Sequence, residues 1–229
     1  MSKKSIILSP LNDSITFFVF RNIRKYLYSS KIILTAVAVF GFAFANAQEV
    51  KFGVKGGLNI SNFSGDVEGN KSRIGYLVGG FAEIKISDKF SIQPELLYSA
   101  QGANFKESGS GFTYEEKQNN GYLNIPVMAK VYVAPKVSIE VGPQIGFLLN
   151  SKSKVEETVD GDVYSVEADT KKFFESTDFG LNFGLGYDLT EKLSIGGRYN
   201  LGLSNILKDA EEGEKVKNSV FSFSVGYKF

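Results

Sequence analysis

Six charged residues stand out because they fall among glycine, serine, asparagine and glutamine on one face of alternating segments. Carboxylates beside cations in such a setting could move protons in catalysis or form buried ion pairs. Lys130 and Glu140 favour the second reading, because an antiparallel hairpin centred on Pro135 places them directly opposite each other. An unpaired buried charge is very costly, so the others should be paired as well. We therefore expect an internal charge network of Glu83, Lys85, Glu95, Lys130, Glu140 and Arg198.

Enzyme chemistry is not expected from this sequence. The chain has no histidine and no cysteine, whereas acyltransferases, deacylases, phospholipases and proteases that use a histidine as general base or triad partner need that residue. A hydrolase that uses carboxylates alone stays formally open. No cofactor or metal is expected either. Asp160-Gly161-Asp162 lacks the remaining ligands of an EF-type calcium loop, and a hairpin turn explains it better.

The segments that carry these residues read in period two. From Phe179 to Leu189, bulky apolar residues alternate with glycine, asparagine and aspartate. Successive side chains of a strand point to opposite faces, so this pattern predicts a strand with one apolar side. The same pattern recurs along the chain. It predicts eight strands, near residues 50–60, 74–86, 90–102, 120–133, 137–150, 177–189, 193–205 and 219–229.

Three short sequence echoes mark the connections between strands. SDKFSI, APKVSI and TEKLSI begin at Ser87, Ala134 and Thr190, and each has a lysine followed by an apolar residue, serine and isoleucine. They predict three tight hairpins on one rim of an up-and-down sheet. The other four connections, 61–73, 103–119, 151–176 and 206–218, are longer and polar. In 151–176, VEETV and VYSVEA predict two further strands that extend above the barrel.

The residue sizes on the two faces indicate which face is outside. The polar face is built mostly from small residues, which suit a crowded interior, and the bulky apolar face suits contact with lipid. An even strand number, short turns on one rim and long loops on the other fit an outer-membrane barrel. The predicted fold is therefore all-β, an eight-stranded antiparallel up-and-down transmembrane β-barrel. Pro94, Pro126 and Pro143 fall inside predicted strands, where we expect bulges or locally broken pairing.

The first 47 residues predict a secretory signal peptide. Basic residues precede the apolar run from Ile32 to Phe44, and Ala45-Asn46-Ala47 forms a cleavage site. The run is too short for a transmembrane anchor. The segment before Arg21 is long for such a signal, which an upstream start assignment would explain. The expected organisation is a signal peptide at 1–47 and a barrel domain at 48–229.

Four segments resemble a known family: ISDKFSIQPELLYSAQG at 86–102, YLNIPVMAKVYV at 122–133, GPQIGFLL at 142–149 and the terminal VGYKF. Together they resemble the PorT-like outer-membrane β-barrel proteins of Bacteroidetes-type bacteria. The resemblance implies an integral outer-membrane barrel that the barrel-assembly machinery inserts. It also implies that Tyr227 and Phe229 form the C-terminal signal which that machinery reads. The family offers no conserved active site to transfer.

Function is expected to lie in the loops, which hold most of the free charge. The leading expectation is a barrel with a side-chain-filled lumen whose loops serve envelope integrity, adhesion or partner binding. One alternative is a narrow porin-like channel for small solutes, and another is an accessory subunit of a secretion or gliding apparatus. Expected partners are outer-membrane lipid, lipopolysaccharide and a surface or secretion-system protein. The near-neutral charge gives no reason to expect nucleic acid. The short turns and both mature termini should be periplasmic, and the long loops extracellular.

Overall fold

The computed structural model describes residues 49–109, 112–159, 162–208 and 213–229. The predicted signal peptide at 1–47 lies outside these residues. Among the described residues, no helix is long and apolar enough to cross a membrane. The elements are β1 (Glu49–Gly65), β2 (Asn70–Ser87), β3 (Phe90–Gly109), β4 (Phe112–Ala134), β5 (Val137–Val159), β6 (Asp162–Asp169), the short helix η1 (Lys171–Phe173), β7 (Thr177–Asp188), β8 (Leu193–Gly202) and β9 (Val216–Lys228).

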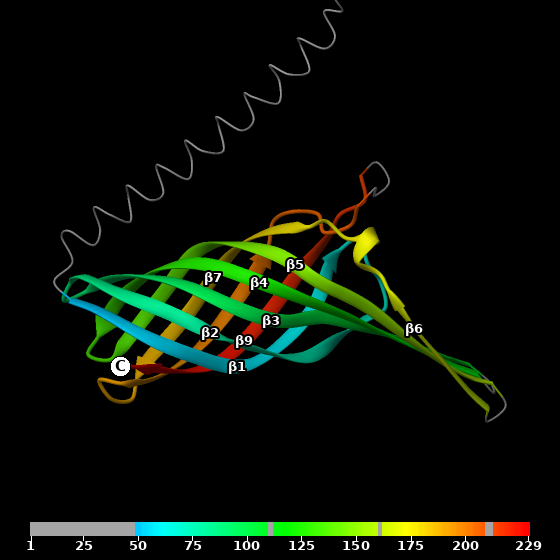
Figure 1. Cartoon of the computed structure of the whole chain (residues 1–229), viewed down its shortest axis with the longest axis horizontal. Helices are drawn as coiled ribbons and strands as arrows, with labels where there is room; N and C mark the ends of the chain where they lie inside the picture. Colours follow the sequence, from blue (N-terminus) through cyan, green and yellow to red (C-terminus); the bar gives the residue numbers. More distant parts are fainter. Residues whose placement is uncertain (1–48, 110–111, 160–161, 209–212) are drawn as a thin grey trace, which may run out of the picture. The chain divides into compact units, whose positions relative to one another are not determined.

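Eight of these strands close into a ring, which confirms the predicted fold class. Each strand pairs antiparallel with its neighbours in the order β1, β2, β3, β4, β5, β7, β8 and β9, and β9 pairs again with β1. Closure leaves no unpaired sheet edge in the ring, as a solvent without hydrogen bonds requires. Strand β6 lies outside the ring and pairs only with β5. In Figure 1 the tight turns lie at the left end of the barrel and β6 at the right.

The three tight turns fall where the sequence echoes predicted them. Thr190 accounts for one of them, because its Oγ1 accepts hydrogen bonds from the backbone N–H groups of Lys192 and Leu193. Ser87 accepts one from Lys89 in the same way. The third turn has no such hydroxyl and instead places Lys136 in the left-handed region, with φ of 74°. Serine or threonine at the start of an echo is therefore a turn former.

Three of the four predicted long loops are largely strand. In 151–176 the two strands expected from the sequence are present, because β5 continues to Val159 and β6 spans Asp162–Asp169. In 103–119, β3 continues to Gly109 and β4 begins at Phe112. In 61–73, β1 and β2 take up most of the segment. The polar composition of these segments hid a period of two that the hydrophobic pattern could not reveal. β5 switches partners on the same side of the ring, pairing with β7 as far as Phe147 and with β6 from Lys152. The parts of β3, β4, β5 and β6 beyond the ring form one sheet, which we call the extension.

The lengths of the strands show where the membrane-spanning part ends. β7 and β8 have 12 and 10 residues, which matches the roughly 9–11 tilted residues that a transmembrane strand needs. β4 and β5 each have 23 residues. Their second halves therefore lie beyond the bilayer, in the extension.

The outer wall of the ring is apolar, as predicted from residue size. Large hydrophobic side chains alternate outward on every strand, while their polar neighbours are buried inside. The lipid-facing band is thus continuous around the barrel. Its strongly exposed members on the eight strands include Phe52, Leu58, Ile74, Val78, Leu96, Val133, Ile139, Phe179, Leu185, Ile195, Phe223 and Val225.

The three strand prolines interrupt pairing without shifting the register. The ladders lose two residue pairs beside Pro94, two beside Pro126 and two beside Pro143, and they resume in the same register on the far side. Locally broken pairing is therefore the outcome, and not bulges. The missing proline N–H explains each gap. The three gaps lie on adjacent strands, β3, β4 and β5.

The loop end of the lumen is closed by an apolar cluster that the sequence did not predict. We call it the loop-end cap. The segments after η1 and after β8 meet there through a β-bridge between Phe174 and Leu207. The interior is therefore polar only in its middle and at its turn end. The buried members of the cap are Phe63, Ala103, Tyr122, Leu148, Phe174, Ile206 and Val216.

Candidate functional site

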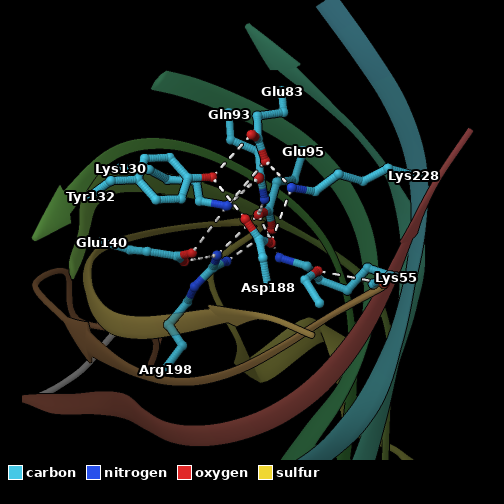
Figure 2. A network of polar contacts seen from close by, with 12 residues as sticks. Lys55, Glu83, Gln93, Glu95, Lys130, Tyr132, Glu140, Asp188, Arg198 and Lys228 are labelled. Atoms are coloured by element: carbon cyan, nitrogen blue, oxygen red, sulfur yellow. Dashed lines mark hydrogen bonds and ion pairs between the residues drawn. The ribbon is translucent and has the colours of Figure 1, made fainter. Parts of the chain in front are cut away.

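Each of the eight ring strands contributes one buried or nearly buried charged side chain to a single cluster in the lumen. Figure 2 shows these side chains converging from all sides of the wall. Four are cations and four are carboxylates, so the cluster is formally neutral. In strand order from β1 to β9 its members, which we call the interior charge set, are Lys55, Glu83, Glu95, Lys130, Glu140, Asp188, Arg198 and Lys228.

Glu95 is the centre of the cluster. Its carboxylate side chain is fully buried and accepts two hydrogen bonds from Arg198, at 2.9 and 3.0 Å. Lys55 Nζ donates to the same carboxylate at 2.7 Å, and Gln93 Nε2 donates at 2.6 Å. Four donors therefore surround this one acid. Charge-assisted bonds of this kind are the strong ones, and the forked arginine contact also fixes orientation.

Arg198 and Lys130 link the centre to the rest of the set. Arg198 Nη2 donates to Glu140 Oε2 at 3.0 Å, and the other oxygen of Glu140 lies 3.6 Å from Lys130 Nζ. Lys130 also contacts Glu83 at 3.1 Å. The strand register places Lys130 opposite Glu140, as the turn at Pro135 predicted. The chain of contacts thus runs from β8 through β5 and β4 to β2.

The set reaches the turn end of the barrel through a second group of contacts. Lys228 Nζ lies 3.0 Å from Glu83 and 3.1 Å from Asp188. The Tyr132 hydroxyl lies between the same two carboxylates, at 3.1 and 3.3 Å. Below this group the lumen opens into a vestibule of about 260 Å³, which the turns surround.

The structure brings together five of the six residues expected in the network, and leaves one out. Lys85 is on the predicted face, but it is two residues nearer the turn than Glu83. It is partly exposed at the mouth of the vestibule and pairs with Asp88 at 3.0 Å. Its expected place in the network is therefore wrong, because it lies beyond the point at which the lumen closes.

Sequence reasoning missed three members of the set, although a usable signal was present. Lys55 alternates with Val54 and Gly56 in the correct phase for the interior, and Asp188 continues the polar face of its strand. Lys228 does the same between the two terminal aromatic residues. All three lie on the interior side by parity alone. Reading the parity of every charged residue in the half of each strand nearest the tight turns would have found them.

Little free volume remains inside the barrel. Between the interior charge set and the loop-end cap lies a layer of amides, in which Asn59 donates to Ser99 at 2.9 Å and Asn200 to Asn182 at 3.2 Å. The cavities beside this layer and beside the charge set measure about 30 and 20 Å³. Each has room for about one or two water molecules. Side chains therefore fill the lumen.

The charge set is a structural and non-enzymatic site. Every one of its carboxylates is bonded to at least one cation, so none is free to take a proton from a substrate. Within the described ranges, no group of three or more acidic side chains is placed to hold a metal ion. What the arrangement can do chemically is neutralise and fill the lumen.

The aromatic residues at the chain end lie on the outer wall near the turns. Tyr227 and Phe229 are both exposed, and their ring centroids are 5.9 Å apart. The backbone N–H of Phe229 donates to the carbonyl of Phe52 at 2.9 Å, which ties the end of the chain to β1. The two rings thus face the lipid at the seam where the barrel closes.

Comparison with known proteins decides the family. Residues 44–208 match the family described as "Outer membrane protein beta-barrel domain", which is well over half of the 229 residues. The chain belongs to this family. The protein is therefore an integral β-barrel of the bacterial outer membrane, as the sequence predicted. A comparison with curated proteins gives no match.

Several solved barrels cover nearly the same part of this family member. Ail, the attachment invasion locus protein of Yersinia pestis, is 14% identical, with 80% of this chain and 100% of that chain covered and a TM-score of 0.46. Neisserial surface protein A is 15% identical, with 80% and 100% covered and a TM-score of 0.43. CarO of Acinetobacter baumannii is 11% identical, with 76% and 97% covered and a TM-score of 0.38.

Proposed function

We propose that this protein is a sealed outer-membrane barrel that holds the extension outside the cell for envelope integrity, adhesion or partner binding. The observation that carries the proposal is the filled lumen. The interior charge set occupies its turn end, amides its middle and the loop-end cap its far end. Moving a solute through would require breaking buried ion pairs, which is costly when a partner is left unpaired.

The orientation in the membrane is part of the same proposal. Outer-membrane barrels carry short turns on the periplasmic side and long loops outside. Here the tight turns and both ends of the barrel domain lie at one rim, and the extension lies at the other. We place the extension outside, where its partners would include lipopolysaccharide. Tyr227 and Phe229 would serve as the assembly signal, since they are exposed beside the closing seam.

A narrow porin-like channel is the second candidate, and the vestibule of about 260 Å³ at the turn end is the observation that favours it. The cavities beyond the vestibule are about ten times smaller, which supports the sealed barrel. The resemblance to PorT-like proteins of Bacteroidetes-type bacteria supports a role as an accessory subunit of a secretion or gliding apparatus. That role rests on sequence resemblance alone.

Planar-bilayer recording of the refolded protein tests the sealed lumen. We expect no steady conductance, and stable, reproducible channels would favour the porin-like alternative. Because the chain has no cysteine, orientation can be tested with two matched variants, Ser108→Cys in the extension and Ser87→Cys at a tight turn. A membrane-impermeant maleimide on intact cells should label only Ser108→Cys. Labelling of Ser87→Cys instead would reverse the proposed orientation.

A further inference from the structure

Strand β6 presents an open sheet edge outside the barrel. One edge of β6 pairs with β5 from Lys152↔Asp169 to Val159↔Asp162 without a register shift. Within the part of the chain that the structure describes, no strand pairs with its other edge. All eight residues of β6 are exposed. Half of its backbone N–H and C=O groups therefore point outward without a partner from the sheet, and they can template another strand.

The edge of β6 is only partly protected, because its charges are all acidic. Natural edges are blunted by short strands, charged side chains (lysine above all), proline, bulges or a covering loop. β6 reads DVYSVEAD and contains neither proline nor lysine. Its valines and tyrosine favour strand pairing, and Val163, Tyr164 and Val166 are 67, 61 and 67% exposed. The sequence of β6 thus favours docking of a further strand.

The charges of the extension differ sharply between its two faces. On the outer face, lysines and glutamates neutralise each other across the strands, as in Lys117–Glu156 at 3.2 Å and Lys152–Glu167 at 2.7 Å. The inner face continues the lumen side of the wall, and its strand register contains no lysine or arginine. Its charged residues are all acidic, namely Glu107, Glu116, Glu157 and Asp162.

These charges disfavour a second copy of this chain as the occupant of the edge. Antiparallel pairing of two full β6 strands would place Asp162 opposite Asp169 at both ends, and parallel pairing would align each acid with itself. Like charges directly opposite each other are destabilising. The acidic inner face and the acidic edge instead complement a cationic strand.

We propose that β6 binds an extended, basic segment of a partner protein, which adds to the extension as a further strand. Backbone hydrogen bonds to the free edge would supply affinity, and alternate side chains would supply specificity. The side chains on the inner face would be lysine or arginine, beside Asp162 and over the exposed ring of Tyr164. Those on the outer face would be apolar, beside Val163. This inference deepens the proposed display function and rests on it for the compartment in which the partner is met.

The test uses the full barrel in nanodiscs of neutral phosphatidylcholine and three short fluorescent peptides. One peptide alternates lysine and valine, one alternates glutamate and valine, and the third is the lysine peptide with alternate backbone amides methylated. Fluorescence polarisation should show the lysine peptide binding at least about tenfold more tightly than either control. Equal binding of the methylated peptide would mean attraction by charge alone and would overturn strand addition. No binding of the lysine peptide would also overturn the proposal.

A pair of matched variants locates the site. The double variant Val163→Lys and Val166→Lys places the usual protective charges on the edge and should weaken binding about tenfold. Glu68→Lys changes the net charge by the same amount in the exposed turn between β1 and β2, and should bind as the unmodified protein does. Undiminished binding by the double variant would overturn the assignment to β6. The peptide assay does not depend on the orientation of the barrel in the membrane. Maleimide labelling of Ser87→Cys instead of Ser108→Cys would therefore refute the display function without deciding whether β6 binds a strand.

Discussion

Arg198 in β8 holds Glu95 in β3 across the barrel interior through two parallel hydrogen bonds of 2.9 and 3.0 Å. These strands are not neighbours in the ring. The contact therefore forms only when the first and second halves of the barrel have come together. Lys228 and Glu83 make a second such connection, between β9 and β2. The interior charge set thus reports and stabilises the closed state.

Replacing Arg198 with methionine should cause the largest loss of stability within the set. Glu95 would lose its forked partner and Glu140 one of its two cations, and breaking a buried pair costs about 3–5 kcal/mol. The measurement is urea unfolding in detergent, followed by the heat-dependent gel shift of the folded barrel. Combining Arg198→Met with Glu95→Gln should recover part of the loss. An unchanged unfolding midpoint in the single variant would refute the role of the pair.

Lys130→Leu should lower heat stability by less than Arg198→Met does. Glu83 keeps Lys228 and Glu140 keeps Arg198 when the Lys130 ammonium is removed. A loss of about 1–3 kcal/mol is expected from the bonds to charged groups. Heat titration of the gel shift compares the two variants directly. Heat stability equal to that of the unmodified protein would contradict the network.

Gly57→Ala and Gly56→Ala form a matched pair on adjacent residues of β1. A methyl group on Gly57 would overlap the backbone carbonyl of Phe223 on β9, whereas one on Gly56 would approach only the Leu77 carbonyl, at 3.9 Å. Backbone cannot move aside as a side chain can, so Gly57→Ala should hinder closure of the β1–β9 seam. The yield of heat-shifted barrel after refolding measures this. Equal yields from both variants would contradict the steric account.

Phe174→Ala should loosen the loop-end cap without unfolding the ring. The Phe174 ring is 9% exposed and packs on Phe63 with centroids 6.4 Å apart. Its loss removes about 3–5 kcal/mol of buried contact. Hydrogen exchange should quicken in residues 170–176, while the gel shift of the barrel stays. The neighbouring Phe173 is 54% exposed, so Phe173→Ala is the control and should change neither.

Acid should loosen the outer face of the extension. The Lys106 ammonium donates to Glu115 and holds the pKa of that carboxyl below its ordinary value of 4.5, and Lys154 and Lys117 lower the pKa of Glu156. A depressed pKa contributes stability above the ordinary value and loses it as pH falls through the folded pKa. Hydrogen exchange in residues 105–109 and 112–117, corrected for the intrinsic rate, should therefore quicken as the pH falls below the ordinary carboxyl pKa of 4.5. Salt at neutral pH should act in the same direction. Exchange that is insensitive to both would contradict the role of these pairs.

Much of the barrel follows from the sequence because a lipid-facing strand leaves a strong signal. Phe179 to Leu189 alternate so regularly that strand, face and lumen side can all be read from them. The turn at Pro135 fixes a register, and the register places Lys130 against Glu140. Contacts of this kind are local in the chain. They can be predicted from the alternation of side chains along each strand and from the residue at the centre of the turn.

The remaining contacts of the site depend on distances across the lumen. The alternation of side chains along a strand gives the face of each residue but not these distances. The contact of Arg198 with Glu95 joins residues 103 positions apart and depends on the stagger of the whole ring. The loop-end cap was hidden for a different reason. Phe63, Phe174 and Ile206 stand singly or in pairs of apolar residues within polar segments, and only their meeting over the mouth of the barrel makes them a core.

Because each ring strand contributes one member of the interior charge set, the arrangement does not depend on where the chain begins. β1 and β9 are neighbours, so the two ends of the barrel domain could be joined by a short linker and the chain reopened at another turn. In such a circular permutant every member of the set would keep its position around the ring of strands. The balance of four cations against four carboxylates is therefore a property of the closed ring and not of the order in which the ribosome makes its strands.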